Sequence, residues 1–145
     1  MKKIISVIAA CVLLLSFAAC GEVSVPSQLN DGTYTGRSAD RNADEDGNGA
    51  GYGEVELEVK DNKIISCTFK TYELDGTLKG ENYGVDLTKE NRMKAQKAVQ
   101  AADKYAEMYV SAGTLEGVDA ISGATVNYDE FKEAVGDALA KASAE

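Results

Sequence analysis

A short loop between two expected helices holds the residues best suited to chemistry. Residues 117–127 read GVDAISGATVN, and Gly123 and Ala124 are small enough for the backbone to approach a ligand closely. Thr125 places a hydroxyl near the start of the second expected helix, where unpaired N–H groups and the helix dipole favour a phosphate group. These residues therefore suggest a phosphate-binding loop. On physical grounds alone the blander alternative, a polar loop that only caps a helix, carries more weight.

Two helices are expected on either side of this loop. Residues 88–112 have helical periodicity, and Gly113 is suited to end that helix. Its expected apolar side consists of Met93, Val99, Ala102, Ala106 and Tyr109. Residues 127–142 form the second expected helix, with Asn127 as its cap and Glu130 completing a capping-box-like pair. The apolar stripe of the second helix consists of Tyr128, Phe131, Val135, Ala138, Leu139 and Ala142.

Strands are expected before the helices. A first short strand covers residues 33–35, and a Gly- and acid-rich loop follows it. Residues 54–60 then alternate charged and apolar side chains, which is typical of a strand with one wet face and one core face. A turn and a second apolar run make residues 54–72 a hairpin. Strands followed by helices predict an α+β fold: a small antiparallel sheet packed against two helices.

The composition excludes several kinds of site. The 145 residues include no histidine, which removes histidine metal sites, histidine general bases and histidine-activated nucleophiles. The 15 basic and 24 acidic residues give a net charge of -9, so we expect no nucleic-acid partner. Three cysteines are too few for a zinc site or a disulfide scaffold. Cys67 lies in a strand-like run, where we expect a small buried hydrophobe.

The first residues have the layout of a secretory signal. Lys2 and Lys3 precede an apolar run that is shorter than the roughly 20 residues needed to span a bilayer. The sequence FAAC at residues 17–20 resembles the lipobox of bacterial lipoproteins, in which the cysteine is acylated. This resemblance implies a signal peptide over 1–19, a lipidated Cys20 with a tether to residue 30, and a domain over 31–145. It also implies an extracytoplasmic protein anchored to the cell membrane by lipid. An uncleaved membrane anchor is the alternative.

Residues 119–125, DAISGAT, resemble the flavinylation motif of the FMN-binding domain family. This family includes domains of sodium-pumping NADH-quinone and related ferredoxin oxidoreductases, and flavinylated lipoproteins of extracellular electron transfer. The sequence DGTYTG at residues 31–36, the hairpin and the closing helix also match the family pattern. The likeness covers about residues 30–142, which is nearly the whole expected domain.

The resemblance implies that FMN is attached covalently to Thr125 through a phosphoester bond. Asp119 and Ser122 would position the loop for the flavin transferase that attaches the FMN. Gly123 and Ala124 would give the bulky FMN room to approach. No residue is implied as a catalytic group or as a metal ligand.

Tyr83 and Gly84 fall where the family often has a Pro-Gly or Tyr-Gly turn, and the resemblance implies that this turn touches the flavin ring. We therefore expect an electron carrier that takes electrons from a membrane or surface donor and passes them to an acceptor. One alternative is a non-redox surface lipoprotein that binds a ligand or partner. Another is a reductase with a site for a small-molecule electron acceptor, although no motif in the sequence indicates such a pocket.

Three further features have structural interpretations. Residues 42–48 resemble half of a calcium loop, but the closing glutamate is displaced by one position, so we expect a solvated acidic loop. Tyr105 and Tyr109 are expected to pack in the core, with stacking on the flavin as the alternative. The charged residues between positions 89 and 104 are expected to form the wet face of the first helix.

Overall fold

The alternating charged and apolar residues of the middle strand give the sheet one exposed face and one buried face. The computed structural model describes residues 26–144 and places strand β2 over Tyr52–Lys60. Val55, Leu57 and Val59 are buried in this strand, while the glutamates between them are exposed. Alternate side chains of a strand point to opposite faces. The buried face is therefore the one that the two helices can cover.

The other two strands complete an antiparallel meander. Strand β1 covers Gly32–Arg37, strand β3 covers Lys63–Tyr72, and the order in the sheet is β1-β2-β3. The predicted hairpin over 54–72 is confirmed. Asp61 and Asn62 form its two-residue turn with φ values of 49° and 60°, a conformation that Asp and Asn tolerate in tight hairpins.

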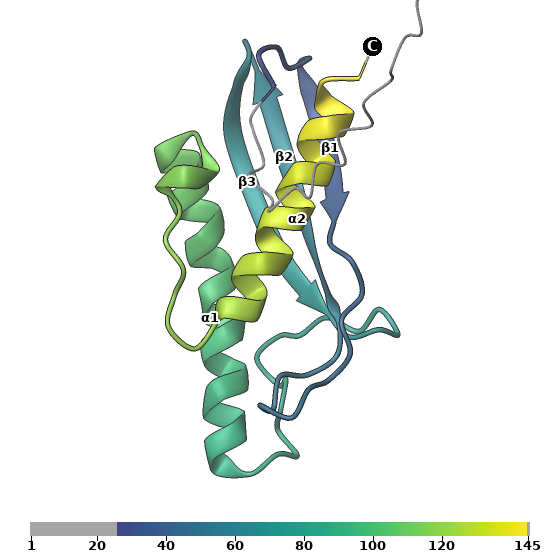
Figure 1. The fold of residues 1–145 in the computed structure, drawn as a ribbon, viewed down its shortest axis with the longest axis vertical. Coiled ribbons are helices and arrows are strands. Elements are labelled where there is room, and N and C mark those ends of the chain that lie inside the picture. Colours follow the sequence, from purple (N-terminus) through teal and green to yellow (C-terminus); the bar gives the residue numbers. More distant parts are fainter. Residues whose placement is uncertain (1–25, 145) are drawn as a thin grey trace, which may run out of the picture.

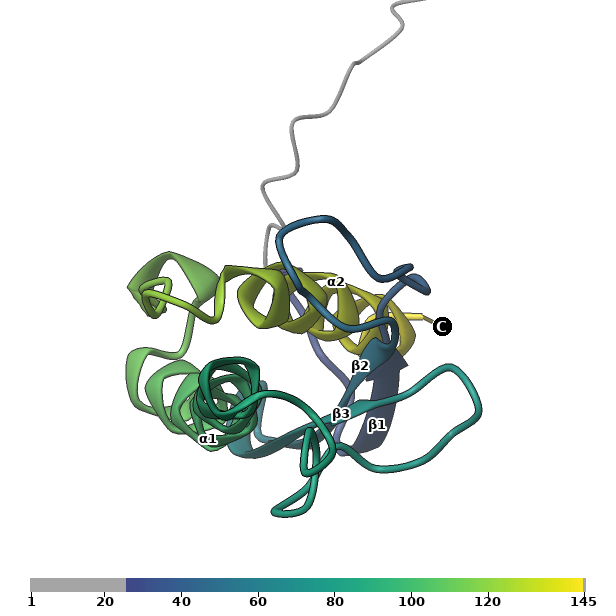
Figure 2. The same ribbon diagram turned by 90° about the horizontal axis from the view of Figure 1, so that it is seen from below.

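Both helices pack on the same face of the sheet. Helix α1 covers Lys89–Ala112 and packs against β3, whereas helix α2 covers Thr125–Ala142 and packs against β1 and β2 (Figures 1 and 2). A 3-10 turn at Leu115–Gly117 lies in the connection between them. The predicted α+β architecture is confirmed.

Both ends of helix α1 are capped, and its predicted termination at Gly113 is confirmed. Thr88 is its N-cap, and the Thr88 hydroxyl accepts a hydrogen bond of 3.3 Å from the N–H of Asn91. Gly113 ends the helix in the left-handed region at φ 74°, and its N–H donates to the carbonyl of Tyr109. Both contacts supply partners to backbone groups that a helix end otherwise leaves unpaired.

The predicted start of helix α2 was wrong. The helix begins at Thr125, two residues earlier than expected, with Ala124 as an N-cap that makes no side-chain hydrogen bond. Asn127 cannot serve as the cap because it lies inside the helix, where its amide donates to the carbonyl of Ala98 in α1 at 3.1 Å. Glu130 is also no part of a capping box: it is buried and lines a cavity. Contacts with α1 therefore override the local capping pattern.

The apolar side of α1 was predicted correctly only in its second half. Ala102, Ala106 and Tyr109 are buried as expected, but Met93 is 64% exposed. The buried residues of this helix begin at Ala101, because its first half runs past the end of the sheet (Figure 1). No layer of the fold lies against Met93 to cover it.

Aromatic rings form the centre of the core. Phe131 is fully buried, with its ring centroid 5.1 Å from that of Phe69 and 5.8 Å from those of both Tyr105 and Tyr109. The packing role predicted for Tyr105 and Tyr109 is confirmed, since both are fully buried. Cys67 packs against this core, and burial raises the pKa of its thiol to about 12. The predicted packing role of Cys67 is confirmed, although its side chain is only partly buried.

The chain joins the domain at the C-terminal end of α2. Leu29 is buried, and its N–H donates to the side chain of Asn62 at 2.7 Å. The N–H of Asn30 donates to the carbonyl of Ala142 at 2.8 Å. The Asn62 amide also donates to the carbonyl of Ser27 at 3.4 Å, so contacts with the hairpin turn extend back to Ser27. The predicted signal peptide and Cys20 lie outside the described residues. Within residues 26–144, no helix is both long and apolar enough to cross a membrane.

Candidate functional site

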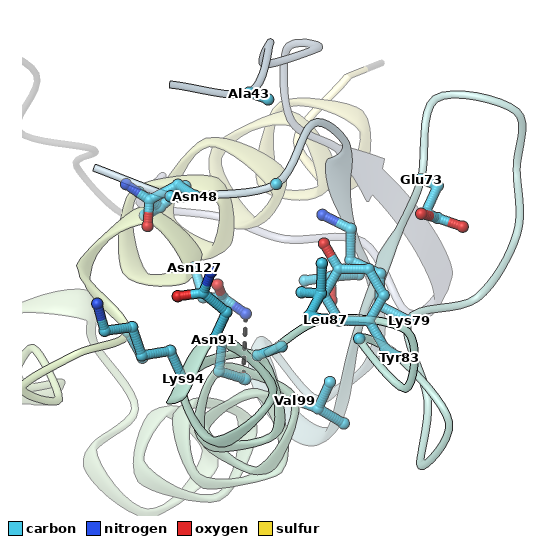
Figure 3. Close-up of a pocket in the computed structure, with 18 of the residues that line it drawn as sticks. Ala43, Asn48, Glu73, Lys79, Tyr83, Leu87, Asn91, Lys94, Val99 and Asn127 are labelled. Carbon is cyan, nitrogen blue, oxygen red and sulfur yellow. Dashed lines mark hydrogen bonds between the residues drawn. The ribbon is translucent and has the colours of Figure 1, made fainter. Parts of the chain in front are cut away.

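A cavity of about 970 Å³ lies where α1 runs past the sheet. Four segments form its walls: the acidic loop at 43–49, the chain from 71 to 87, the first half of α1 between 91 and 99, and the start of α2 from 123 to 130 (Figure 3). These segments are distant in sequence. The cavity therefore exists only in the folded protein.

The cavity brings together five of the seven residues that the sequence singled out as cofactor-binding. Gly123, Ala124 and Thr125 line one wall, and Tyr83 and Gly84 line another. Sequence analysis placed these two groups in one site only through the family resemblance, and the structure now shows them facing a common space.

The other two predicted residues, Asp119 and Ser122, are not brought into the cavity. They lie on the loop that leads to α2, they are exposed, and they are not among the residues that line the cavity. Their place on the surface beside Thr125 leaves them open to a second protein.

Side chains from the helices hold the loop before Thr125 in place. The Tyr105 hydroxyl donates to the carbonyl of Ala124 at 3.0 Å and accepts from the N–H of Ile121 at 2.9 Å. The Tyr128 hydroxyl donates to the carbonyl of Val118 at 2.9 Å. A buried polar group gains most when all its hydrogen-bonding capacity is used. The loop is therefore fixed from beneath by the core, although its outer surface is exposed.

Thr125 occupies the first position of α2 with its side chain exposed. Because the preceding cap makes no side-chain hydrogen bond, the N–H groups of the first helical turn keep their capacity to donate. Such N–H groups and the positive end of the helix dipole favour a phosphate group. The local structure thus offers an accessible hydroxyl next to a suitable position for a phosphate.

The opposite wall is a tight turn that α1 holds. Gly84 has φ 79°, and a side chain there would come within 3.0 Å of Cβ of Ala95 in α1. The Gln96 amide donates to the carbonyls of Gly80 and Tyr83, at 3.2 and 2.8 Å. A glycine is needed at position 84 for both the backbone conformation and the close approach.

Apolar side chains in this wall are exposed to the cavity. Leu78, Val85 and Leu87 each line it and are each 50–51% exposed. Ligand pockets of roughly 300–1,000 Å³ with mainly apolar walls are typical binding sites for flat organic molecules. The size and lining of the cavity therefore fit a ring system with an attached phosphate.

Sequence analysis missed two lysines of α1. Their predicted place on the wet face is confirmed because both are exposed, and Lys94 also lines the cavity. The ammonium of Lys97 lies 3.2 Å from the position that a Cβ on Gly123 would occupy. Their i, i+3 spacing places them on one side of the helix, which is the available sequence signal. Which side faces the motif depends on tertiary packing.

Two buried charged residues were also not predicted from the sequence. Lys79 is 9% exposed and Glu130 is 2% exposed, and both line the cavity. Burial lowers the pKa of Lys79 and raises the pKa of Glu130. The Lys79 ammonium lies 5.1 Å from the ring centroid of Tyr83. Arg41 approaches Glu130 to 4.0 Å and makes a closer ion pair of 2.6 Å with Glu133.

The acidic loop at residues 42–48 is closed by its own hydrogen bonds. The Asp44 carboxylate accepts from the N–H groups of Asp46 and Asn48 at 3.1 and 2.9 Å, and from the Asn48 amide at 2.7 Å. These bonds lower the pKa of Asp44. Across residues 26–144, no three acidic or thiol side chains converge on a point that could hold a metal ion.

The cavity carries more negative than positive charge. Its positive residues are Lys79 and Lys94. Its acidic residues are Asp44, Asp46, Glu73, Glu81, Asp86 and Glu130. A dianionic phosphate is therefore not held by the general field of this site, and local contacts at the start of α2 must orient it.

Comparisons with known proteins agree with this geometry. A family model described as "FMN-binding domain" matches residues 48–140, which is more than half of the chain. The crystal structure of the CPE2226 protein from Clostridium perfringens has a similar fold, with a TM-score of 0.58 and 21% sequence identity over 79% of this chain and 89% of that one. At that identity the likeness concerns the fold alone. No curated protein sequence matches this chain.

Proposed function

Because the chain belongs to the FMN-binding domain family, we propose that it is an electron carrier whose FMN is joined covalently to Thr125. The family match supports FMN binding, and the phosphoester bond to the Thr125 hydroxyl is the further step of this proposal. One observation carries it: Thr125 is exposed at the first position of α2, in the wall of a cavity large enough for the rest of FMN.

The residues at the start of α2 would hold the phosphate end of FMN. The first-turn N–H groups would donate to phosphate oxygens, and Lys94 and Lys97 would supply positive charge beside them. Gly123 has φ 80° and no side chain, which keeps space open between the loop and α1. The chain's own residues thus orient the phosphate.

The opposite wall would hold the ring. Tyr83, Leu78, Val85 and Leu87 present apolar surface to the cavity, and FMN supplies the chemistry of accepting and releasing electrons when bound. The exposed apolar side chains would lose contact with water on binding, which gains about 25 cal/mol for each Å² of apolar surface covered. No catalytic acid or base is needed for this function.

A covalent bond suits the charge of this site. The cavity is acidic, and so is the whole chain with its net charge of -9. Electrostatic attraction would retain a free dianionic phosphate poorly, whereas a phosphoester keeps the cofactor regardless of dilution. The expected partner for attachment is a flavin transferase, and exposed Asp119 and Ser122 would take part in its recognition.

We also propose that the carrier is extracytoplasmic and held to the membrane through a lipid on Cys20. The lipobox-like sequence FAAC supports this proposal. More than one acyl chain gives stable anchoring, since each buried CH₂ contributes about 0.8 kcal/mol. The electron donor and acceptor would then be membrane or surface components. Labelling cells with radioactive palmitate tests the anchor, and Cys20→Ala should abolish the label. A label that persists in this variant contradicts the lipid assignment.

The decisive experiment is the intact mass of the protein after co-expression with a flavin transferase. We expect an added mass of about 438 Da, which is FMN less one water, on the peptide that contains Thr125. Thr125→Ala should lose this mass and the flavin fluorescence on a denaturing gel. Thr77→Ala is the matched control, because Thr77 is an exposed threonine that lines the same cavity.

Two outcomes would overturn the attachment to Thr125. One is a fluorescent Thr125→Ala band on the denaturing gel. The other is an unmodified wild-type mass when the transferase is shown to modify another substrate. The second result would favour a non-redox binding module built on the same cavity.

A further inference from the structure

The two positive residues that line the cavity differ in their surroundings. Lys94 is exposed, and its ammonium forms an ion pair of 3.6 Å with Glu90 on the surface of α1. Lys79 is buried and lies across the cavity from Lys94, beside Tyr83 (Figure 3). An exposed ammonium is screened by water, whereas a buried one acts on its neighbours through a medium of low dielectric constant. Lys79 is therefore the cation with the stronger influence on a ligand.

The fold makes room for the Lys79 ammonium. A Cβ on Gly51 would lie 2.5 Å from Nζ of Lys79 and would also clash with the carbonyl of Tyr72. The N–H of Lys79 donates to the carbonyl of Thr71 at 2.9 Å, which fixes the backbone next to strand β3. The absence of a side chain at position 51 thus leaves the space that the Lys79 side chain fills.

Opposite charges near Lys79 come from two elements. Glu130 of α2 and Glu73 after β3 both face it, and Tyr83 lies against it in the following turn. Beyond Glu130 stands Arg41, which is already paired with Glu133. Within residues 26–144, no ion pair of 4.0 Å or less is formed by the Lys79 ammonium. The Lys79 side chain lines the cavity, with its ammonium beside Gly51 and 5.1 Å from the ring centroid of Tyr83.

We propose that Lys79 raises the reduction potential of the bound flavin by placing a positive charge in the part of the cavity that the flavin ring would occupy. This inference rests on the proposed function. The phosphate of FMN would be fixed at Thr125, on the wall beside Lys94, and the ring would extend across the cavity toward Lys79 and Tyr83. Lys79 is then a positioning and potential-setting residue, and it takes no part in attachment.

The charge balance of flavin reduction gives the reason. Two electrons from the donor and one proton from solvent, bound at N5, leave the ring with one additional negative charge. That charge is spread over N1 and the C2 carbonyl. A nearby ammonium stabilises this reduced form relative to the neutral oxidised ring, so electrons are accepted at a higher potential.

The carboxylate of Glu130 provides a second test, because its negative charge should lower the reduction potential of the flavin. Glu130 is buried near Lys79, and its negative charge opposes the accumulation of negative charge on the ring. Burial raises the pKa of Glu130, which weakens this opposition by favouring the neutral carboxyl. Removing the charge at Glu130 should therefore shift the potential upward, and removing the charge at Lys79 should shift it downward.

The test uses full-length, flavin-loaded protein and compares Lys79→Met with Lys70→Met. Lys70 is exposed on the outer face of the sheet, so its substitution removes the same charge away from the cavity. The midpoint potential is measured by dithionite titration in the presence of reference dyes. We expect a lower potential for Lys79→Met, a wild-type value for Lys70→Met and a higher potential for Glu130→Gln.

A second readout separates an electrostatic role from a structural one. The proton that binds N1 of the reduced flavin is followed by absorbance as pH is varied. Loss of the ammonium should raise the pH at which this proton binds, whereas Lys79→Arg should leave that pH and the potential close to wild type. The Arg variant also keeps the test informative if Lys79→Met does not fold.

Three results would overturn the proposal. The first is an equal potential for Lys79→Met and Lys70→Met. The second is a shift of Lys79→Met and Glu130→Gln in the same direction, which loosened packing would produce. The third is a wild-type protein that holds no flavin, which overturns the proposed function as well. The mass of each sample tells these cases apart, because the first two are seen only in protein that carries flavin.

Discussion

The two ends of the molecule differ in how far their apolar side chains are buried. At the core end, α2 and the second half of α1 cover the sheet, and Phe131, Val135 and Leu139 are buried. At the cavity end, the first half of α1 and the long loops enclose a space, and none of residues 89–100 is buried. Exposed Leu78, Val85 and Leu87 lie at the cavity end. The comparison teaches that buried apolar side chains at the core end stabilise the fold, whereas those at the cavity end remain exposed and available to a ligand.

The largest expected effect tests the core end. Phe131→Ala removes the ring at the centre of the aromatic cluster and should lower the free energy of unfolding by about 3–5 kcal/mol. Val99→Ala at the cavity end should cost less than about 1.5 kcal/mol, because that side chain is only half-buried. Urea unfolding of the flavin-free protein followed by circular dichroism measures both values. Equal losses would break the distinction between the two ends.

The second prediction concerns the residue that joins the two ends. Tyr105 is packed in the core, yet its hydroxyl holds the loop before Thr125. Tyr105→Phe leaves the N–H of Ile121 without this partner and should cost about 1–3 kcal/mol. It should also slow flavin attachment by the transferase. Tyr34→Phe is the control, since the Tyr34 hydroxyl makes only an exposed bond of 3.4 Å. A normal attachment rate in Tyr105→Phe would show that the loop holds its shape unaided.

A smaller effect is expected at the start of α1. Thr88→Ala removes the cap of the helix half that forms a cavity wall and should cost about 1 kcal/mol. Thr114→Ala is the matched control, because Thr114 precedes a 3-10 turn and makes no side-chain capping bond. Hydrogen exchange should show faster opening of residues 89–100 in Thr88→Ala than in the control. Uniform acceleration over the whole domain would mean that the first half of α1 does not open on its own.

The smallest effect on stability is expected at Lys94. Its ion pair with Glu90 is exposed, so Lys94→Met should change the free energy of unfolding by less than about 0.5 kcal/mol. The same substitution should slow flavin attachment, because it removes a positive charge beside the proposed phosphate position. Lys63→Met, an exposed lysine of β3, should leave attachment unchanged. A stability loss larger than that of Thr88→Ala would assign Lys94 to the core end.

The sequence was most informative where local chemistry decides the structure. The alternation in β2, the turn at Asp61 and Asn62, and the end of α1 at Gly113 all follow from properties of neighbouring residues. The motif around Thr125 was also visible, because its small residues and hydroxyl are contiguous. Its partner turn at Tyr83 entered the site only through the family resemblance, and the fold was needed to show the two walls facing each other.

Other features required packing that the sequence pattern does not contain. Asn127 lies inside α2, where its amide donates to the carbonyl of Ala98 in α1, and it does not cap the helix. Met93 lies on the expected apolar side, but the sheet ends before reaching it. Lys79 and Glu130 resemble ordinary surface residues in the sequence, and only the folded chain buries them beside one cavity. Each of these depends on residues far away along the chain.

The hydrogen bond between Asn30 and Ala142 fixes the amino-terminal segment at the C-terminal end of α2. Helix α2 leads from that contact to Thr125, and its 18 residues span roughly 27 Å. The helix therefore acts as a rigid arm, with the amino-terminal contact at its C-terminal end and the cavity at its N-terminal end. Rotation of the domain about the C-terminal end of α2 would move the cavity farther than the rest of the domain. For a carrier anchored through its amino-terminal side, as we propose, this geometry would let one anchored molecule present its cavity to partners at different positions.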